Sequence, residues 1–215
     1  MSPISVFVFD VDGTLLDSAA DITAALREVL EGHLANGLDE GLVRRYIGFH
    51  LIEFFRRVLP HYDDDQHWEL IQRYRAVYSA RAHRLTRVYP GVREMLARLP
   101  GRKATATTKS TATVRAVLDQ FGLLEYFDHP QGTDGLPAKP APDVIHAALN
   151  ALGARPEECL LVGDSTADME AGRRAGVRIC AVRYGYGDPA ELARFDPDYW
   201  VETPQQLLGI AGVVE

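Results

Sequence analysis

The arrangement of hydrophobic and polar residues along the chain divides it into three regions. Residues 4–9 (ISVFVF) are β-branched or aromatic almost throughout, which is typical of a strand buried on both faces of a parallel sheet. From residue 16 to about residue 86 the apolar side chains recur at helical spacing, and no convincing strand interrupts them. From Tyr89 onward, short apolar runs alternate with helical patterns. The pattern predicts a helical segment inserted after the first strand of an α/β sheet.

The helical segment contains four predicted helices. Asp17 or Ser18 is available to cap the first helix, the second and third helices are separated near Gly48, and the acids at 63–65 suit the N-terminus of the fourth. The apolar faces comprise Ile22, Ala25, Leu26, Val29 and Leu30 in the first helix, Val43 and Ile47 in the second, Phe54 and Phe55 in the third, and Trp68, Ile71 and Tyr78, with Arg75, in the fourth.

The last region predicts the remainder of the sheet. Strands are expected near residues 103–107, 160–162, 177–182 and 199–201, with helices between them. Alternating strands and helices of this length form right-handed βαβ units with helices on both faces of the sheet. We therefore expect a doubly wound, Rossmann-like α/β core with a parallel sheet, residues 1–15 and 87–215, and an inserted all-α cap domain, residues 16–86.

Composition and charge limit the possible partners. The 215 residues are 47% hydrophobic and 25% charged, and the net charge is −7, which disfavours a nucleic acid or an anionic membrane surface as the main partner. Cys159 and Cys180 lie in predicted buried strands, where free thiols are expected. Neither a secretory signal nor an apolar run of about 20 residues is apparent. We expect a cytoplasmic monomer or homodimer.

Polar clusters lie at or near the carboxyl ends of the predicted strands, where parallel sheets bind ligands. Asp10 and Asp12 follow the first strand, and two carboxylates this close repel each other unless a cation or a phosphate network compensates them. Three further clusters follow along the chain: Thr107-Thr108-Lys109, Lys139-Pro140-Ala141-Pro142-Asp143, and Gly163-Asp164-Ser165-Thr166-Ala167-Asp168.

Taken in order, these clusters resemble the four motifs of the haloacid dehalogenase superfamily: Asp-x-Asp, a hydroxyl, a lysine and a second pair of acids. Tyr89-Pro90-Gly91-Val92 and Arg183-Tyr184-Gly185-Tyr186-Gly187 are similar to the phosphoglycolate-phosphatase-like branch. The resemblance implies a Mg²⁺-dependent phosphatase with a helical cap. Its substrate would be a small phosphorylated metabolite, a phosphoglycolate-like or sugar phosphate monoester, hydrolysed through an aspartyl-phosphate intermediate.

The resemblance also implies roles for the acids. Asp10 would be the nucleophile, and Asp12 the general acid and then the general base, with its acidity weakened by nearby anions. Magnesium would be bound by one Asp10 oxygen, the backbone carbonyl of Asp12 and Asp164, since it prefers hard oxygen ligands. Asp168 would orient metal-bound water or hold Lys139; otherwise it is an acid that favours a helix N-terminus.

The phosphate site implied by the resemblance comprises Thr107, Thr108, Lys139 and Gly13. Thr107 would donate its hydroxyl to a phosphoryl oxygen, and Lys139 would supply a positive charge. Thr108 stands where the family often has asparagine, which puts the role of this side chain in doubt. Lys109 is expected to be exposed.

In capped relatives, the loop around Gly48 approaches the active site. His50 stands where the phosphoglycolate-like branch often has proline or a small residue, which weakens a transfer of glycolate specificity. Arg45 is a candidate for binding a substrate carboxylate, although a solvated arginine is the favoured interpretation. Substrate contacts are therefore expected at Gly48 and His50, with Arg45 as the weaker candidate.

Other functions remain open. The same core serves β-phosphoglucomutase-like phosphotransferases and pyrophosphatases. A receiver-type phospho-acceptor signalling module also has strand-end acids, a hydroxyl and a lysine, but it would be shorter and would have no cap. A dehalogenase and a phosphonate-cleaving enzyme are disfavoured, because their first motifs typically lack the second acid, which is present here as Asp12.

Overall fold

A five-stranded parallel sheet lies at the centre of the computed structural model, which describes residues 3–213. The strand order is β4-β1-β5-β6-β7, so the first strand lies inside the sheet as its apolar sequence predicts. The terminal residues 1–2 and 214–215 of the expected core lie outside the described residues. The strands are β1 (Val6–Phe9), β4 (Arg102–Thr105), β5 (Cys159–Gly163), β6 (Arg178–Val182) and β7 (Tyr199–Val201).

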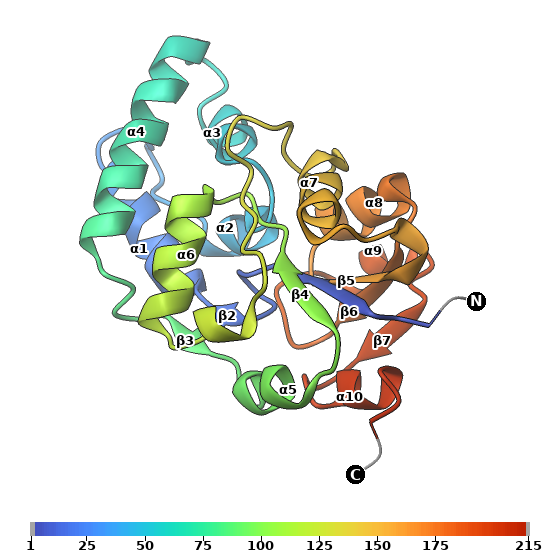
Figure 1. Ribbon diagram of the computed structural model, residues 1–215. Helices are drawn as coiled ribbons and strands as arrows, with labels where there is room; N and C mark the ends of the chain where they lie inside the picture. The colour runs from blue at the N-terminus through green and yellow to red at the C-terminus, as the bar shows by residue number, and fades with distance from the viewer. Residues whose placement is uncertain (1–2, 214–215) are drawn as a thin grey trace.

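Helices cover both faces of the sheet (Figure 1). Side chains of β1 alternate between the two faces: Phe7 and Phe9 pack with α5, α6 and α10, whereas Val6 and Val8 pack with α7 and α8. The expected doubly wound α/β core is confirmed. The core helices are α5 (Val92–Arg98), α6 (Thr111–Gln120), α7 (Asp143–Leu152), α8 (Thr166–Ala175), α9 (Pro189–Ala193) and α10 (Gln206–Ile210), with 3₁₀ turns at Leu124–Tyr126 and Pro156–Glu158.

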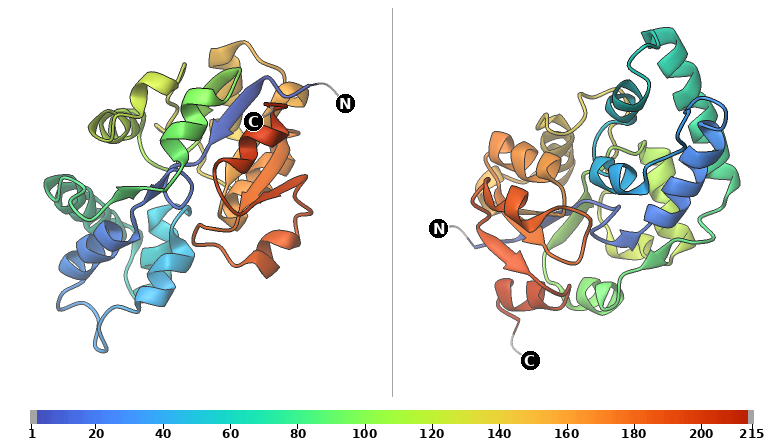
Figure 2. Two further views of the ribbon diagram at one scale, coloured as in Figure 1. Left: turned by 90° about the horizontal axis from the view of Figure 1, so that it is seen from below. Right: turned by 180° about the vertical axis from the view of Figure 1, so that it is seen from behind.

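Four of the helices between β1 and β4, those that precede Arg87, share a separate apolar cluster. Both views of Figure 2 place these blue-to-teal helices to one side of the sheet, away from the two termini. Their own core supports the proposed cap, residues 16–86. These cap helices are α1 (Ala19–Val29), α2 (Glu40–Tyr46), α3 (Leu51–Val58) and α4 (Asp64–Ala80).

A short antiparallel ribbon connects the cap helices to the core. It pairs β2 (Leu16–Asp17) with β3 (Arg87–Val88). With the proposed cap boundaries, β2 belongs to the cap and β3 belongs to the core. The expectation of no strand in this region is wrong at its first two residues. Two residues are too few to show the alternation of apolar and polar side chains that identifies a strand.

The starts of two cap helices differ in how well the sequence predicts them. Asp63 caps α4 in a reciprocal capping box with Gln66, as the acidic helix start suggests. Ser18 stands at the N-cap of α1, but its hydroxyl makes no capping bond. It donates instead to Asp12, 2.5 Å away.

Two other expectations concern cysteines and membranes. Cys159 and Cys180 are both free and buried, as expected. None of the helices within residues 3–213 is long and apolar enough to cross a membrane.

Candidate active site

Asp10 is the first residue after β1 and is almost completely buried. Its amide donates to the carbonyl of Val162 in the neighbouring strand β5, which fixes the backbone at this point. Burial, opposed by Lys139 and reinforced by the charge of Asp168, raises the pKa of Asp10 to about 7. A carboxylate in this position therefore requires positive charge close by.

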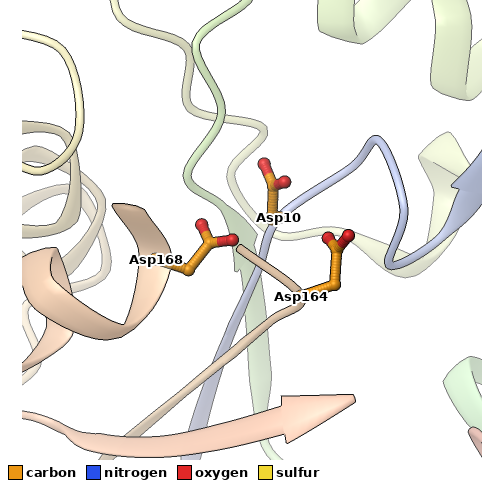
Figure 3. A group of neighbouring side chains, drawn as sticks. All are labelled: Asp10, Asp164 and Asp168. Carbon is orange, nitrogen blue, oxygen red and sulfur yellow. The ribbon is translucent and has the colours of Figure 1, made fainter. Parts of the chain in front are cut away.

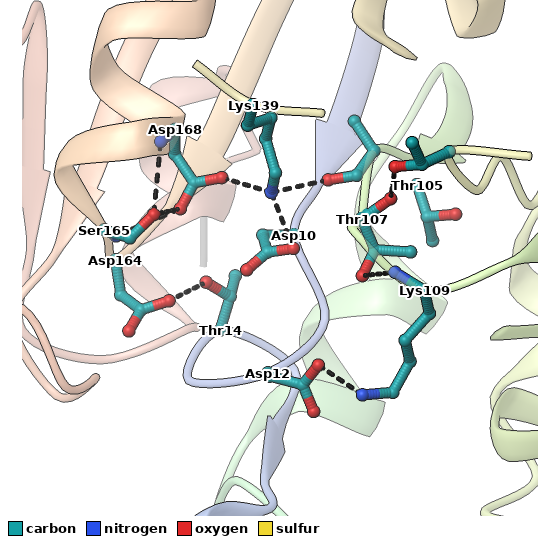
Figure 4. Close-up of polar contacts among 12 residues, drawn as sticks. Asp10, Asp12, Thr14, Thr105, Thr107, Lys109, Lys139, Asp164, Ser165 and Asp168 are labelled. Atoms are coloured by element: carbon teal, nitrogen blue, oxygen red, sulfur yellow. Dashed lines mark hydrogen bonds and ion pairs between the residues drawn. The ribbon is translucent and has the colours of Figure 1, made fainter. Parts of the chain in front are cut away.

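Lys139 supplies that charge from the loop before α7. Its Nζ is fully buried and donates to Asp10 Oδ1 at 2.9 Å, to Asp168 Oδ1 at 2.5 Å and to the carbonyl of Ala106 at 2.9 Å (Figure 4). Although burial alone would lower the pKa of Lys139, the two carboxylates raise it above its usual range. The ammonium is thus held between two acids.

Asp168 lies in the first turn of α8 and is fully buried. Its Oδ1 accepts from Lys139, and its Oδ2 accepts from the amide and the hydroxyl of Ser165, at 3.0 and 2.6 Å. Both carboxylate oxygens therefore already have hydrogen-bond donors from the protein. Asp168 orients Lys139 and caps α8.

Asp164 follows β5 and points toward the same end of the sheet as Asp10 and Asp168 (Figure 3). Oδ1 accepts from the Thr14 hydroxyl at 3.0 Å and Oδ2 accepts from the amide of Tyr186 at 2.8 Å. Burial, together with the charges of Asp168 and Asp10, holds the pKa of Asp164 well above its ordinary value. Its ionised form lacks a cationic side-chain partner among the described residues.

Gly13 lies directly beside Asp164. A Cβ on Gly13 would come within 2.1 Å of Asp164 Oδ2, and the glycine has a positive φ of 85°. Both facts require glycine at this turn, because the left-handed conformation is strained for other residues and the space is already filled.

The acids fit a magnesium ion. One oxygen each from Asp10, Asp164 and Asp168 lies within 4.8 Å of the others, and Asp10 Oδ2 is buried without a hydrogen-bond partner in the described structure. Carboxylate oxygens are hard donors of the kind that Mg²⁺ prefers, and the unpartnered oxygen of Asp10 is available to such an ion. Asp168 is paired with the Lys139 ammonium, whereas Asp10 has an unpartnered oxygen and Asp164 has no cationic side-chain partner among the described residues. Asp10 and Asp164 are therefore the better candidates for direct ligands.

Lys109 is not exposed, contrary to the sequence-based expectation. Its side chain is 12% exposed, and Nζ lies 2.5 Å from Asp12 Oδ2 and 5.1 Å from the ring centre of Tyr78 in α4. Asp12 also accepts a hydrogen bond from the Ser18 hydroxyl. Burial favours the protonated acid, but Lys109 and Ser18 outweigh it and lower the pKa of Asp12. The expected weakening of Asp12 as an acid is therefore wrong for this arrangement.

The two threonines lie in the loop that follows β4. β4 ends at Thr105, so Thr107 lies in the loop beyond the strand and does not end it. Its buried hydroxyl accepts from the amide of Lys109 at 3.3 Å. Thr108 lines a cavity of about 880 Å³ between the cap helices and the core, together with Asp12 and Lys109.

Cap residues differ in their relation to this cavity. Gly48 and His50 line it. A Cβ on Gly48 would lie 2.9 Å from Ser165 Oγ, so the cap loop closely approaches the core. Arg45 does not line the cavity; its side chain is 64% exposed and its guanidinium lies 3.9 Å from Asp39. The geometry favours the solvated interpretation of Arg45.

Tyr186 is a further residue of this site whose part the sequence did not predict. Its hydroxyl accepts from the amides of Ser18 and Ala19 at 2.7 and 3.0 Å, and donates to Asp17 Oδ1 at 2.8 Å. Tyr186 thus caps α1 from a distant loop. The Tyr-Gly-Tyr-Gly pattern indicated a loop bordering the site, but nothing in it identifies a partner 169 residues away.

Comparisons with known proteins agree over nearly the whole chain. Residues 7–182 match the family model described as haloacid dehalogenase-like hydrolase. The chain is 33% identical to pyrophosphatase PpaX from Halalkalibacterium halodurans, over 98% of each chain. It is 31% identical to a phosphoglycolate phosphatase from Vibrio vulnificus, over 96% of each.

Solved structures show the same architecture. A haloacid dehalogenase-like hydrolase from Streptococcus pneumoniae superposes with a TM-score of 0.88 at 29% identity, covering 97% of this chain and 99% of the other. A hydrolase from Pseudomonas syringae gives a TM-score of 0.81 at 29% identity, covering 95% and 96%.

Proposed function

The chain belongs to the haloacid dehalogenase-like hydrolase family, and we propose that it is a magnesium-dependent phosphatase acting on a small phosphate monoester through an aspartyl-phosphate intermediate. The observation that carries this proposal is the buried contact between Asp10, Lys139 and Asp168. It supplies an ionisable nucleophile in a site from which water is largely excluded, with a fixed positive charge beside it.

In the first step, a carboxylate oxygen of Asp10 attacks phosphorus and forms an acyl phosphate. The bond from phosphorus to the ester oxygen breaks, and the departing alcohol takes a proton from Asp12. In the second step, water attacks the same phosphorus while Asp12 accepts its proton. The bond to Asp10 then breaks, which releases inorganic phosphate and restores both carboxyl groups.

The residues proposed to hold magnesium are one oxygen of Asp10, the backbone carbonyl of Asp12 and Asp164. When bound, the ion neutralises charge on the phosphoryl oxygens. The buried, unpartnered Asp10 Oδ2 and the raised pKa of Asp164 support this assignment, because both conditions are relieved by a cation.

The transferring phosphoryl group would be bound by the hydroxyl groups of Thr107 and Thr108 and by the charge of the Lys139 ammonium, with the turn at Gly13 beside it. The Gly13 amide itself already donates to the carbonyl of Leu16 at 2.8 Å. Lys109 enters the same region, since its ammonium contacts Asp12. A phosphate dianion competes with Asp12 for this ammonium. Its binding would draw Lys109 away and leave Asp12 a weaker acid, as proton donation to the alcohol requires.

The proposal is tested by phosphate release and by trapping the intermediate. The wild-type protein should release phosphate from an ester only with Mg²⁺, and acid-quenched protein should carry a phosphoryl group on the peptide containing Asp10. Asp10→Asn should abolish both signals, and Asp12→Asn should lower turnover by about 10²–10⁴-fold. Normal turnover by Asp10→Asn, or a phosphoryl group on another residue, contradicts the mechanism.

Pyrophosphate hydrolysis is the second candidate, because one relative with 33% identity is a pyrophosphatase. The leaving group of pyrophosphate is itself a phosphate, so this reaction calls for several cationic side chains in the part of the site that holds the leaving group. Lys109 and Arg75 are the lysine and arginine that line this cavity among the described residues, and its cap wall is mostly apolar and aromatic. A direct comparison of pyrophosphate with monoesters, including a test for transfer to sugar, separates the three activities.

A further inference from the structure

The cavity of about 880 Å³ lies between the cap helices and the α6 side of the core. Its lining includes Asp12, Thr108 and Lys109, where the cavity meets the proposed catalytic site. Under the proposed function, Asp12 gives its proton to the departing alcohol, so the alcohol part of the ester lies on the cavity side of the phosphoryl group. The walls of this cavity therefore select the alcohol, and this inference rests on the proposed function.

The cap wall of the cavity is unusually aromatic. Six aromatic side chains from α2, α3, α4 and the loop after α2 line it: Tyr46, Phe49, Phe54, Trp68, Tyr74 and Tyr78. Among the described lining residues, carboxylates occur only at Asp12 and Asp134, and the latter is bonded to the amide and hydroxyl of Thr111. A wall of this kind binds flat apolar groups by stacking and by burial of apolar area.

The volume does not arise from a cap that is separated from the core. Gly48 approaches Ser165 so closely that a Cβ would be 2.9 Å from its hydroxyl oxygen. On another side, the Lys109 ammonium lies 5.1 Å from the centre of the Tyr78 ring, so a core lysine contacts the cap. The cavity is thus present while cap and core are in contact.

Trp68 is the most informative residue of the wall. It is 43% exposed, and the other large hydrophobic residue exposed to this degree within the described chain is Leu85, at 48%. Trp68 lines the cavity, with its ring 6.4 Å from that of His50, whereas Leu85 does not line it. An indole kept partly in water beside an aromatic cavity is available to stack on a ligand.

We propose that the alcohol part of the substrate carries an aromatic ring, which packs against the aromatic cap wall with Trp68 at its edge. A two-carbon alcohol such as that of phosphoglycolate would leave most of this wall in contact with water. Clefts of about 300–1,000 Å³ suit ligands that bury most of their surface, and an aromatic alcohol meets that condition here.

Kinetics with matched esters test the proposal. Ethyl phosphate and benzyl phosphate both release primary alcohols, so they differ mainly in the ring. With Mg²⁺, kcat/KM for benzyl phosphate should exceed that for ethyl phosphate by at least about tenfold. Trp68→Ala should reduce this ratio roughly two- to tenfold, whereas Leu85→Ala, the matched exposed residue outside the cavity, should preserve it.

Three kinetic results would overturn the proposal: a ratio near one in the wild-type protein, equal changes of the ratio in the two variants, or a preference for 2-phosphoglycolate or pyrophosphate over benzyl phosphate. A ratio near one, equal changes in the two variants or a preference for 2-phosphoglycolate leaves the phosphatase proposal intact, whereas a preference for pyrophosphate favours the second candidate function instead. Failure to hydrolyse any ester would instead contradict the proposed function, and binding then decides the question of the ring.

Binding is measured with phosphonates, in which carbon replaces the ester oxygen and prevents hydrolysis. The chain has two tryptophans, so Trp200→Phe leaves Trp68 as the single indole reporter. With Mg²⁺, 2-phenylethylphosphonate should quench its fluorescence and bind at least about tenfold more tightly than propylphosphonate. Equal affinities, or binding of the aromatic compound without a change in Trp68 fluorescence, would overturn the proposal.

Discussion

The hydroxyl of Tyr186 lies 2.8 Å from Oδ1 of Asp17, and this contact bonds a core loop to the ribbon that leads into the cap. The same hydroxyl accepts hydrogen bonds from the backbone amides of Ser18 and Ala19 at the start of α1. The backbone amide of Tyr186 donates to Asp164. One residue therefore connects the proposed metal ligand with the entry to the cap.

Removing this hydroxyl should destabilise the protein. Tyr186→Phe leaves the amides of Ser18 and Ala19 without an acceptor, and losing a helix cap with buried donors costs about 1–3 kcal/mol. Tyr184→Phe is the control, because the Tyr184 hydroxyl makes one bond, to the carbonyl of Thr14 at 3.0 Å. Urea unfolding should show the larger loss for Tyr186→Phe. Equal losses would mean that the capping of α1 contributes nothing measurable.

The turn at Gly13 provides a second matched pair. Gly13 and Gly32 both have a positive φ, of 85° and 80°, so alanine at either position should cost about 1–2 kcal/mol of stability. The space around Gly32 is open, whereas a Cβ at Gly13 collides with Asp164. Gly13→Ala should therefore also displace Asp164 and reduce turnover by about 10²-fold. Phosphate release at saturating Mg²⁺ measures this, and similar activities of the two variants would contradict it.

Much of this site follows from the sequence because it depends on strand order. β1 and β5 are recognisable as buried apolar runs, and they pair directly, with Phe9 opposite Val162. The residues that follow them are thus brought together whatever the loops do. This accounts for the predicted meeting of Asp10 and Asp164 at one end of the sheet.

The contacts that the sequence did not predict depend on side-chain direction and on the placement of the cap. Lys109 follows a strand by several residues, and its long side chain turns from solvent toward Asp12, where it also contacts Tyr78 of a separate helix. Tyr186 contacts Asp17 because the ribbon formed by β2 and β3 lies beside the loop that contains Tyr186. Periodicity and motif order carry no information on either relationship.

The two acids of the last motif should respond in opposite ways to neutralisation. Asp168→Asn removes one of the two carboxylates that contact the buried Lys139, and the loss of this charged contact should cost about 1–3 kcal/mol while Asp10 still pairs with the ammonium. Asp164→Asn removes a buried charge that lacks a cationic partner among the described side chains, and the Thr14 hydroxyl is able to reverse its hydrogen bond. In chelator, Asp164→Asn should unfold at an unchanged or higher temperature than the wild-type protein.

Magnesium distinguishes the same two variants. Asp164→Asn should require far more Mg²⁺ for activity, since it replaces a proposed ligand. Asp168→Asn should change the Mg²⁺ requirement less, although it lowers stability. Calorimetric unfolding and Mg²⁺ titrations of activity measure the two properties separately. The opposite order of the Mg²⁺ requirements would assign the ligand role to Asp168.

Mg²⁺ should stabilise the protein more as the pH rises through about 7. The pKa of Asp10 is raised from 3.8 to about 7, so between these values the folded protein keeps a proton that the unfolded chain has lost. Without metal, Asp10 therefore contributes a fall in stability of up to about 1.4 kcal/mol per pH unit as the pH rises across this window. Asp164, with its raised pKa, acts in the same direction.

Two histidines oppose this trend at lower pH. The pKa values of His50 and His83 are lowered from 6.5, mainly by burial. The unfolded chain therefore takes up these protons first as the pH falls, which lowers the stability of the folded protein. The pH dependence of the total stability is therefore a poor measure of the protonation of Asp10 and Asp164. The number of protons released when Mg²⁺ binds is a better measure of it. Titration calorimetry in two buffers of different ionisation enthalpy counts it. About one pH unit below 7, Mg²⁺ should displace protons, and about one unit above, it should displace fewer. The absence of proton release at both pH values would show that neither Asp10 nor Asp164 holds its proton in the folded protein, and equal release at both would contradict a pKa of Asp10 near 7.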